Sequence, residues 1–427
     1  MERKTILIGL NELNFSYIQS YIDKGSLPNF KYIFETYGYK ETTSEDQYEL
    51  LEPWIQWVTL HTGKTYDEHQ VFRLGDIVNR EDLEQLWEIA EKKGLSVGAI
   101  SPFNVANRLE KPVFFVPDPW TKTKISGEAF VEKVAMAVSQ AVNDNAQGGL
   151  TIDSVLAIVR AYLKVVPMTS YGEYVALASK IKSKVGIKAV ILDKLLGDLF
   201  IQQWKKYQPD FSSLFLNSGA HIQHHYMFNS IAYDGPLKNP DWYCSQDQDP
   251  LGLILKEYDA FLGKMLKLNT RFIVATGLHQ QPHKHNTFYW RLKKHAEFLE
   301  QINIKGFSNV IPRMSRDFLV EFEDEQKAAK AHKVIESYKS ITDNIQMFTV
   351  DNRGLSLFIE LTYPNDIDDN FIIKGEFEVK NFKDYIAFVA IKNGEHNGIG
   401  YFLDSETNQL PDQFELTKVF DHIVSSF

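Results

Sequence analysis

Short apolar runs, each followed by polar residues, constrain the fold of this chain more than any other feature. The runs span residues 5–10, 95–101, 211–216 and 271–276. Runs of this length are typical of parallel strands that are buried on both faces. Amphipathic helices are predicted between the runs, for example over residues 14–22 and 80–93. We therefore predict a three-layer α/β fold with a doubly wound, mostly parallel sheet.

The chain is too long, at 427 residues, for one simple core, so insertions or a second domain are expected. Helical periodicity predicts a helical insertion or cap over residues 127–206. Short apolar segments on either side of a charged, helix-like segment predict a small α+β subdomain over residues 317–365. The predicted α/β core then comprises residues 1–126, 207–316 and 366–427.

Two further segments receive a local prediction. The spacing of apolar residues over 288–302 predicts a helix. Two prolines close together in 114–120 predict a loop, and this loop carries Asp118. Since loops often carry function, Asp118 is a candidate for binding substrate.

Composition narrows the class of partner. The net charge is −10 and the pI is near 5.7, which argues against nucleic-acid binding, because that requires a basic patch. A local cleft can still bind a small anionic substrate. No apolar stretch reaches transmembrane length, and the first run is too short for a signal peptide. We expect a cytoplasmic protein without an integral membrane segment.

Histidines cluster directly after the third apolar run. His221, His224 and His225 lie within five residues, and histidine is both a common metal ligand and a near-neutral acid or base. His221 and His224 are three residues apart and would share one face of a helical turn. The cluster contains no carboxylate. The alternative interpretation is a set of hydrogen-bonded imidazoles at the end of a strand.

Other polar and aromatic residues lie where the sheet is expected to end. Asn11 and Glu12 follow the first run. They either belong to a turn in which Asn14 caps the next helix, or Asn11 contacts substrate and Glu12 exchanges protons. Glu52 precedes a helix that starts at Pro53, and either favours the helix dipole or contacts substrate. Trp54 and Trp57 are typical of core residues, although tryptophan also provides a floor for a sugar or a base.

Several motifs, taken in order, resemble the alkaline phosphatase superfamily, especially its type I phosphodiesterase/nucleotide pyrophosphatase branch. The first strand resembles the one that ends in a metal-binding Asp, and later stretches resemble the "G-x-x-P-N", "T-G…H", "D-H-x-x-H", "D-x-x-x-G" and "S-D-H-G" motifs and the last metal histidine. These stretches are residues 6–11, 25–29, 54–69, 219–224, 258–263, 275–279 and 395–400. The resemblance implies an alkaline phosphatase-like core.

The same resemblance implies two metal ions held by Asp and His, with a Thr or Ser nucleophile between them. This chain has other residues at four of those positions, namely Asn11, Pro53, Ala220 and Leu278. The matching histidines are His224, His279 and His396. We therefore expect catalysis by these three histidines and Glu12, and at most one divalent ion, zinc or manganese, held by His224 and His396.

Two functions follow from this pattern. The first is a hydrolase or transferase that acts on a phosphate or sulfate ester of a small, sugar- or nucleotide-linked substrate. Its substrate would contact Asn11, Glu52, Trp54, Trp57, His221 and Asp118. The alternative is a pseudoenzyme without metal that serves as a binding or scaffolding protein, for example in glycan assembly. Convergence of the histidines around a polar site favours the first, and dispersed histidines favour the second.

Overall fold

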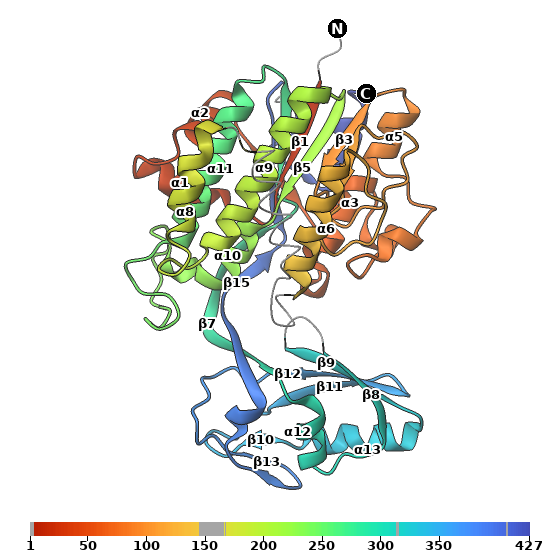
Figure 1. Cartoon of the computed structure of the whole chain (residues 1–427), viewed down its shortest axis with the longest axis vertical. Coiled ribbons are helices and arrows are strands. Elements are labelled where there is room, and N and C mark those ends of the chain that lie inside the picture. The colour runs from red at the N-terminus through yellow and green to blue at the C-terminus, as the bar shows by residue number, and fades with distance from the viewer. Residues whose placement is uncertain (1–3, 145–165, 167, 313–315, 407–408) are drawn as a thin grey trace. The chain divides into compact units, whose positions relative to one another are not determined.

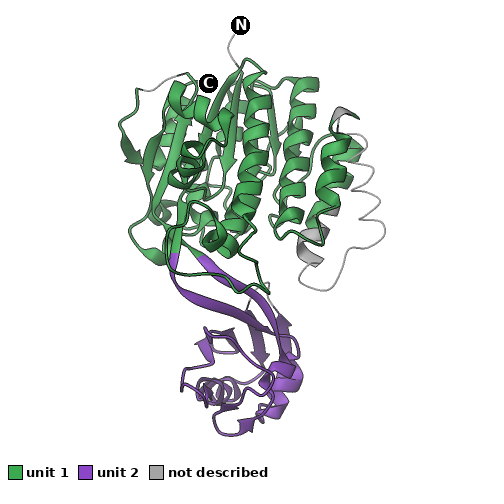
Figure 2. Cartoon of the chain, turned by 90° about the vertical axis from the view of Figure 1, so that its left-hand side faces the viewer, with its two compact units in different colours: residues 1–282, 394–427 green, residues 283–393 purple. Residues whose placement is uncertain are grey.

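The computed structural model describes residues 4–144, 166, 168–312, 316–406 and 409–427. The chain divides into two compact units (Figure 2). Unit 1 comprises residues 1–282 and 394–427, and unit 2 comprises residues 283–393. In the described part of the chain, every helix is too short or too polar to cross a lipid bilayer.

The core of unit 1 is an eight-stranded sheet in the order β17–β2–β16–β6–β1–β5–β3–β4. The five strands from β6 to β4 are mutually parallel, and β16 runs antiparallel to β6 and β2. The bounds are β1 (Thr5–Leu10), β2 (Lys40–Thr43), β3 (Val97–Ile100), β4 (Phe114–Val116), β5 (Phe211–Leu216), β6 (Arg271–Ala275), β16 (Ile399–Asp404) and β17 (Gln413–Glu415). The predicted, mostly parallel sheet is confirmed.

Helices cover both faces of this sheet (Figure 1). In β1, Ile6 and Ile8 pack on one face with α1, α2, α6, α9 and α11, whereas Leu7 packs on the other with α3, α5 and α14. The helices of unit 1 are α1 (Phe15–Asp23), α2 (Pro28–Tyr37), α3 (Pro53–Thr62), α4 (Tyr66–His69), α5 (Leu86–Lys92), α6 (Ala129–Asp144), α8 (Tyr171–Ala178), α9 (Ile187–Tyr207), α10 (Ser218–Tyr226), α11 (Pro250–Leu266) and α14 (Thr417–Val424). This alternation is the three-layer arrangement that the sequence predicts.

The described part of the segment predicted as a helical insertion, residues 127–206, contains α6, α8 and most of α9 joined by turns, and residues 145–165 and 167 lie outside the described residues. Its last helix, α9, does not stand apart from the core. Leu199 and Phe200 of α9 are buried in the cluster that covers one face of the sheet, and α9 leads directly into β5. In this fold α9 therefore takes the place of a crossover helix.

Unit 2 is an α+β unit with its own apolar core, which contains Phe298, Val320, Phe348 and Ile359. One antiparallel sheet has the order β11–β12–β9–β8, and a smaller one has the order β10–β13–β14. The bounds are β8 (Phe307–Pro312), β9 (Asp317–Phe322), β10 (Lys339–Ser340), β11 (Phe348–Asn352), β12 (Ser356–Leu361), β13 (Ile373–Lys374), β14 (Glu378–Val379), α12 (His295–Gln301) and α13 (Glu325–Glu336).

Unit 2 is larger than the predicted subdomain of residues 317–365, because the chain passes between the units inside two paired strands. These are β7 (His279–Leu292) and β15 (Ile386–Asn397). The predicted helix over 288–302 is wrong at its start, since Phe288 to Leu292 continue β7 and α12 begins at His295. Aromatic residues at 288–290 favour the strand.

The predicted loop over residues 114–120 is also wrong at its start. Phe114–Val116 forms β4, which pairs with β3 at the edge of the sheet. Pro117 and Pro119 lie beyond the strand, so no ladder hydrogen bond is lost there. Asp118 lies in the loop that follows.

A buried ion pair fixes the C-terminal helix to the sheet. Arg271 Nη2 at the start of β6 lies 2.6 Å from Asp404 Oδ2 at the end of β16, and both side chains are almost fully buried. His422 of α14 bonds the same oxygen through Nε2 at 2.7 Å. The carboxylate therefore joins two strands and a helix.

We expect Asp404→Ala to lower the free energy of unfolding by about 3–5 kcal/mol, because the buried Arg271 charge loses its close partner and keeps only the more distant Glu406, at 3.8 Å. The matched control is Asp421→Ala in α14, which removes an exposed pair with Lys418. That change should cost about 0–1 kcal/mol. Urea denaturation of both variants checks this, and equal losses would contradict the assignment.

Candidate functional site

Glu12 lies at the carboxyl end of the sheet, two residues after β1. It is 2 % exposed and has φ of +56°, in the left-handed region. Such a backbone costs a residue other than glycine about 1–3 kcal/mol and is common at functional sites. Hydrogen bonds over-determine the turn: Glu12 N donates to Thr276 O, while Gln280 N and Gln223 Nε2 donate to Glu12 O.

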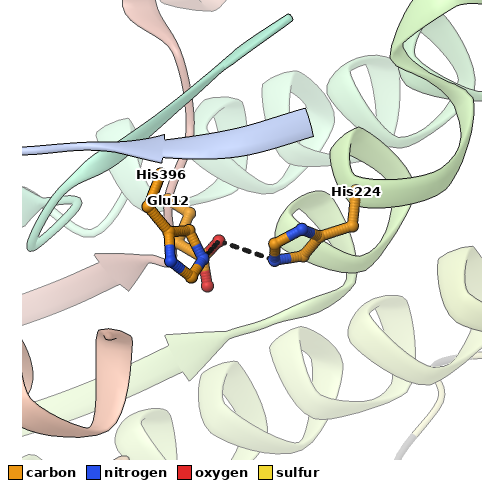
Figure 3. Close-up of side chains that lie close together, drawn as sticks. All are labelled: Glu12, His224 and His396. Atoms are coloured by element: carbon orange, nitrogen blue, oxygen red, sulfur yellow. Dashed lines mark hydrogen bonds and ion pairs between the residues drawn. The ribbon is translucent and has the colours of Figure 1, made fainter. Parts of the chain in front are cut away.

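The Glu12 carboxylate is surrounded by donors. Its Oε2 atom lies 3.0 Å from His224 Nε2 and 3.1 Å from His396 Nε2 (Figure 3). Gln280 Nε2 donates to the same oxygen at 2.6 Å. The other oxygen, Oε1, accepts from Asn11 Nδ2 at 2.9 Å. A buried carboxylate needs such partners, because an unpaired charge in the interior is costly.

The two histidines reach Glu12 from distant parts of the sequence, and both belong to unit 1. His224 lies in the last turn of α10, directly after β5, and His396 lies near the end of β15. The His224 side chain is 31 % exposed and the His396 side chain 13 %, so the cluster is open to solvent mainly beside His224.

The ionisation of Glu12 is governed by opposing effects. Burial raises its pKa, but the charges and hydrogen bonds of His224 and His396 together outweigh burial and hold the pKa well below the usual range. Glu12 is therefore a carboxylate at neutral pH, ready to act as an anionic ligand or as the partner of a cationic imidazole.

The donor set suits a divalent metal ion. One carboxylate oxygen and two imidazole nitrogens, from Glu12, His224 and His396, all lie within 4.8 Å of one another. Two His and one Glu form a common ligand set of catalytic zinc, with the fourth position open. A second carboxylate lies near the other ring nitrogen of one ligand: Glu52 Oε2 is 3.8 Å from His396 Nδ1. Such outer partners orient the imidazole of a metal ligand.

His279 does not join this cluster in the described structure. Its Nδ1 lies 2.6 Å from Ile399 O, and its ring packs on Tyr401. Burial lowers the pKa of His279, although the bond to Ile399 opposes this effect. Successive residues of a strand face opposite sides, and here the neighbour Gln280 is the one that reaches Glu12.

The predicted aromatic residues are held by structural hydrogen bonds. Trp57 is 1 % exposed, and its Nε1 donates to Asn11 Oδ1 at 2.7 Å, so it offers no stacking surface. Trp54 Nε1 donates to Phe72 O at 3.0 Å. Trp57 thus acts on the site through Asn11, which bonds Glu12 in turn.

Two other predicted residues lie apart from the Glu12 cluster. Asp118 is 2 % exposed and accepts hydrogen bonds from the backbone nitrogens of Asn104, Trp120 and Thr121. These bonds organise its loop. His221 is exposed, and its ring packs against that of His225 one helical turn later.

Amides that were not among the predicted site residues complete the surroundings of Glu12. Gln280 and Gln223 bond its carboxylate and its carbonyl, and Asn217 Oδ1 accepts from Asn11 Nδ2 at 2.7 Å. Strand alternation after His279 is a signal that could have revealed Gln280. Nothing in the sequence pattern distinguishes Asn217 from an ordinary helix-start residue, or Gln223 from an ordinary residue inside a helix.

No protein-family model matches the sequence, and no curated protein sequence matches it either. Solved structures do match. Phosphonoacetate hydrolase from Sinorhizobium meliloti 1021 is 11% identical with a TM-score of 0.45, covering 100% of this chain and 96% of that chain. Human ectonucleotide pyrophosphatase/phosphodiesterase 5 is 11% identical with a TM-score of 0.45, covering 99% and 95%.

Alkaline phosphatase from the Antarctic bacterium TAB5 is 12% identical with a TM-score of 0.42, covering 99% of this chain and 97% of that chain. Likeness at this level says nothing about activity, which depends on the residues of the site.

The bond between Gln280 and Glu12 depends on a glycine in β15. A Cβ atom added at Gly394 would overlap Gln280 Oε1. We expect Gly394→Ala to displace Gln280 from Glu12 and to lower the free energy of unfolding by about 1–3 kcal/mol, because a buried carboxylate loses a donor. The control is Gly172→Ala in α8, where a Cβ meets no atom within 4 Å. Urea denaturation distinguishes the two, and a Gly394 variant as stable as its control would contradict this packing.

Proposed function

We propose that this chain is a hydrolase or transferase that acts on a phosphate or sulfate ester with the help of one divalent ion. The ion would be zinc or manganese, held by Glu12, His224 and His396. The observation that carries the proposal is the convergence of one carboxylate oxygen and two Nε2 atoms within 4.8 Å, from three separate elements. The ester class is supported by the motifs that the sequence shares with the alkaline phosphatase superfamily.

A divalent ion in this position would supply Lewis-acid chemistry toward an ester oxygen. The residues of the chain would hold the ion and orient its ligands. The negative charge of Glu52, at 3.8 Å from His396 Nδ1, would favour a proton on that nitrogen, so that the lone pair of Nε2 faces the ion. Gln280 and Asn11 would keep Glu12 ionised and fixed.

The start of α3 supports direct attack by water over a covalent route. Pro53 is the first residue of that helix, and it offers no side-chain oxygen where the family has its nucleophile. Among the cluster residues none carries a hydroxyl or a thiol. A water molecule at the solvent-exposed side of His224 is therefore the proposed nucleophile, or an acceptor alcohol in the transferase version.

We expect protein purified without chelator to contain close to one zinc or manganese ion per chain, because three ligand atoms converge on one position. Glu12→Gln, His224→Ala and His396→Ala should each lose most of the ion. The control is His285→Ala, which removes an exposed imidazole of β7. Elemental analysis is the measurement.

The metal-loaded protein is then screened against phosphomonoesters, phosphodiesters and sulfate esters. Hydrolysis that disappears with the ion supports the proposal. Wild type that takes up no ion even on reconstitution contradicts the metal site. An ion without turnover of any ester would instead favour a binding protein on the same fold.

A second prediction concerns Glu52. We expect Glu52→Gln to weaken metal affinity about 10–100-fold, because the outer carboxylate no longer orients the His396 ring. The control is Glu49→Gln, an exposed carboxylate three residues earlier. Competition with a chromogenic chelator measures both affinities, and equal affinities would assign Glu52 a role other than orienting His396.

A further inference from the structure

The orientation of two neighbouring amide side chains near Glu12, those of Asn11 and Asn217, follows from one group that can only donate. Trp57 Nε1 has no acceptor capacity, so the atom of Asn11 that it contacts at 2.7 Å must be Oδ1. Asn11 Nδ2 then faces both Glu12 Oε1, at 2.9 Å, and Asn217, at 2.7 Å. The atom of Asn217 in that contact is therefore Oδ1, and its Nδ2 group faces away from Asn11.

Asn217 lies beside the metal cluster. Leu10 of β1 pairs with Leu216 of β5, so Asn11 and Asn217 follow adjacent parallel strands at the same edge of the sheet. Asn11 Nδ2 donates to both Glu12 Oε1 and Asn217 Oδ1. These two oxygens therefore cannot be farther apart than the sum of the two hydrogen-bond lengths.

The side chain of Asn217 does not perform its usual structural task. Asparagine at a helix start normally caps the first backbone N–H groups. Here Asn217 makes no capping bond. Ser218 N donates instead to Asp193 Oδ2, and Gly219 N donates to Tyr258 Oη, each at 2.9 Å. Asn217 is therefore not needed to complete α10.

The amide nitrogen of Asn217 is available to a ligand. The residue is half-buried, and no described residue accepts a hydrogen bond from its Nδ2. The result is a neutral donor of fixed orientation beside two imidazoles and a carboxylate. Amide donors of this kind bind anionic oxygens strongly, because a hydrogen bond to a charged acceptor is stronger than one to a neutral acceptor.

We infer that the Asn217 amide donates a hydrogen bond to a phosphoryl or sulfuryl oxygen of the substrate. Trp57 sets the orientation of this amide through Asn11. This assignment rests on the proposed function for its substrate class. It makes Asn217 a residue that selects for a charged oxyanion.

The test measures binding of inorganic phosphate by calorimetry, with and without added zinc or manganese. Asn217→Asp keeps the size of the side chain and an oxygen for Asn11, but replaces the donor by a negative charge. Asn217→Ala removes the group. The control is Ser218→Ala, whose hydroxyl bonds Ala189 O within the helix layer.

We expect Asn217→Asp to weaken phosphate binding by about tenfold or more, in line with the loss of one hydrogen bond to a charged group, while the metal content stays unchanged. Asn217→Ala should show a smaller loss in the same direction, and Ser218→Ala none. Circular dichroism confirms that each variant is folded, and the Asp variant remains informative if the Ala variant is not.

Three outcomes overturn the inference. The first is phosphate binding that is unchanged in both Asn217 variants. The second is wild type that binds no phosphate in either metal state. The third is tighter metal binding by Asn217→Asp without loss of phosphate, which would make this position a ligand position instead. Phosphate binding that needs Asn217 but no metal would contradict the proposed metal site and support the role of Asn217 as a donor.

Discussion

The buried carboxylate of Glu12 is the constraint on which the rest of the site depends. An ionised group that is 2 % exposed needs donors, and Glu12 obtains them from four directions, namely Asn11, His224, Gln280 and His396. These residues come from the ends of β1, α10, β7 and β15. Placing one charge at the carboxyl edge of the sheet therefore fixes the register of elements that are far apart in the sequence.

Much of the architecture could be predicted because its signals are local. Buried parallel strands are short, apolar and separated by amphipathic helices, and these patterns gave the doubly wound sheet. The bounds of unit 2 could not be predicted in this way. β7 and β15 cross from one unit to the other without a break in strand pattern, so no local signal marks the change at residues 282 and 394.

Residue type and position point to part of the candidate cluster, for a physical reason. His224, His396 and Glu12 were candidates from residue type and position, and they lie together. His279 was a candidate on the same grounds and faces Ile399, because adjacent residues of a strand point to opposite sides. Trp57 has a polar role that no hydrophobic pattern reveals, since it depends on which atom meets its indole nitrogen. Contacts of this kind are properties of the folded chain alone.

The amides around Glu12 give a consistent account of the chemistry that this site can support. The side-chain nitrogens of Asn11 and Gln280 donate to the Glu12 carboxylate, and that of Gln223 donates to the backbone carbonyl of Glu12. An amide nitrogen that donates in this way cannot be a metal ligand. Two adjacent divalent ions need several anionic ligands, whereas one ion is matched by a single carboxylate and two imidazoles. The set around Glu12 thus has ligand atoms for one ion, and the amide nitrogens help to keep the Glu12 carboxylate charged. The amide of Asn217 presents a donor beside these ligands, where a carboxylate would repel an oxyanion.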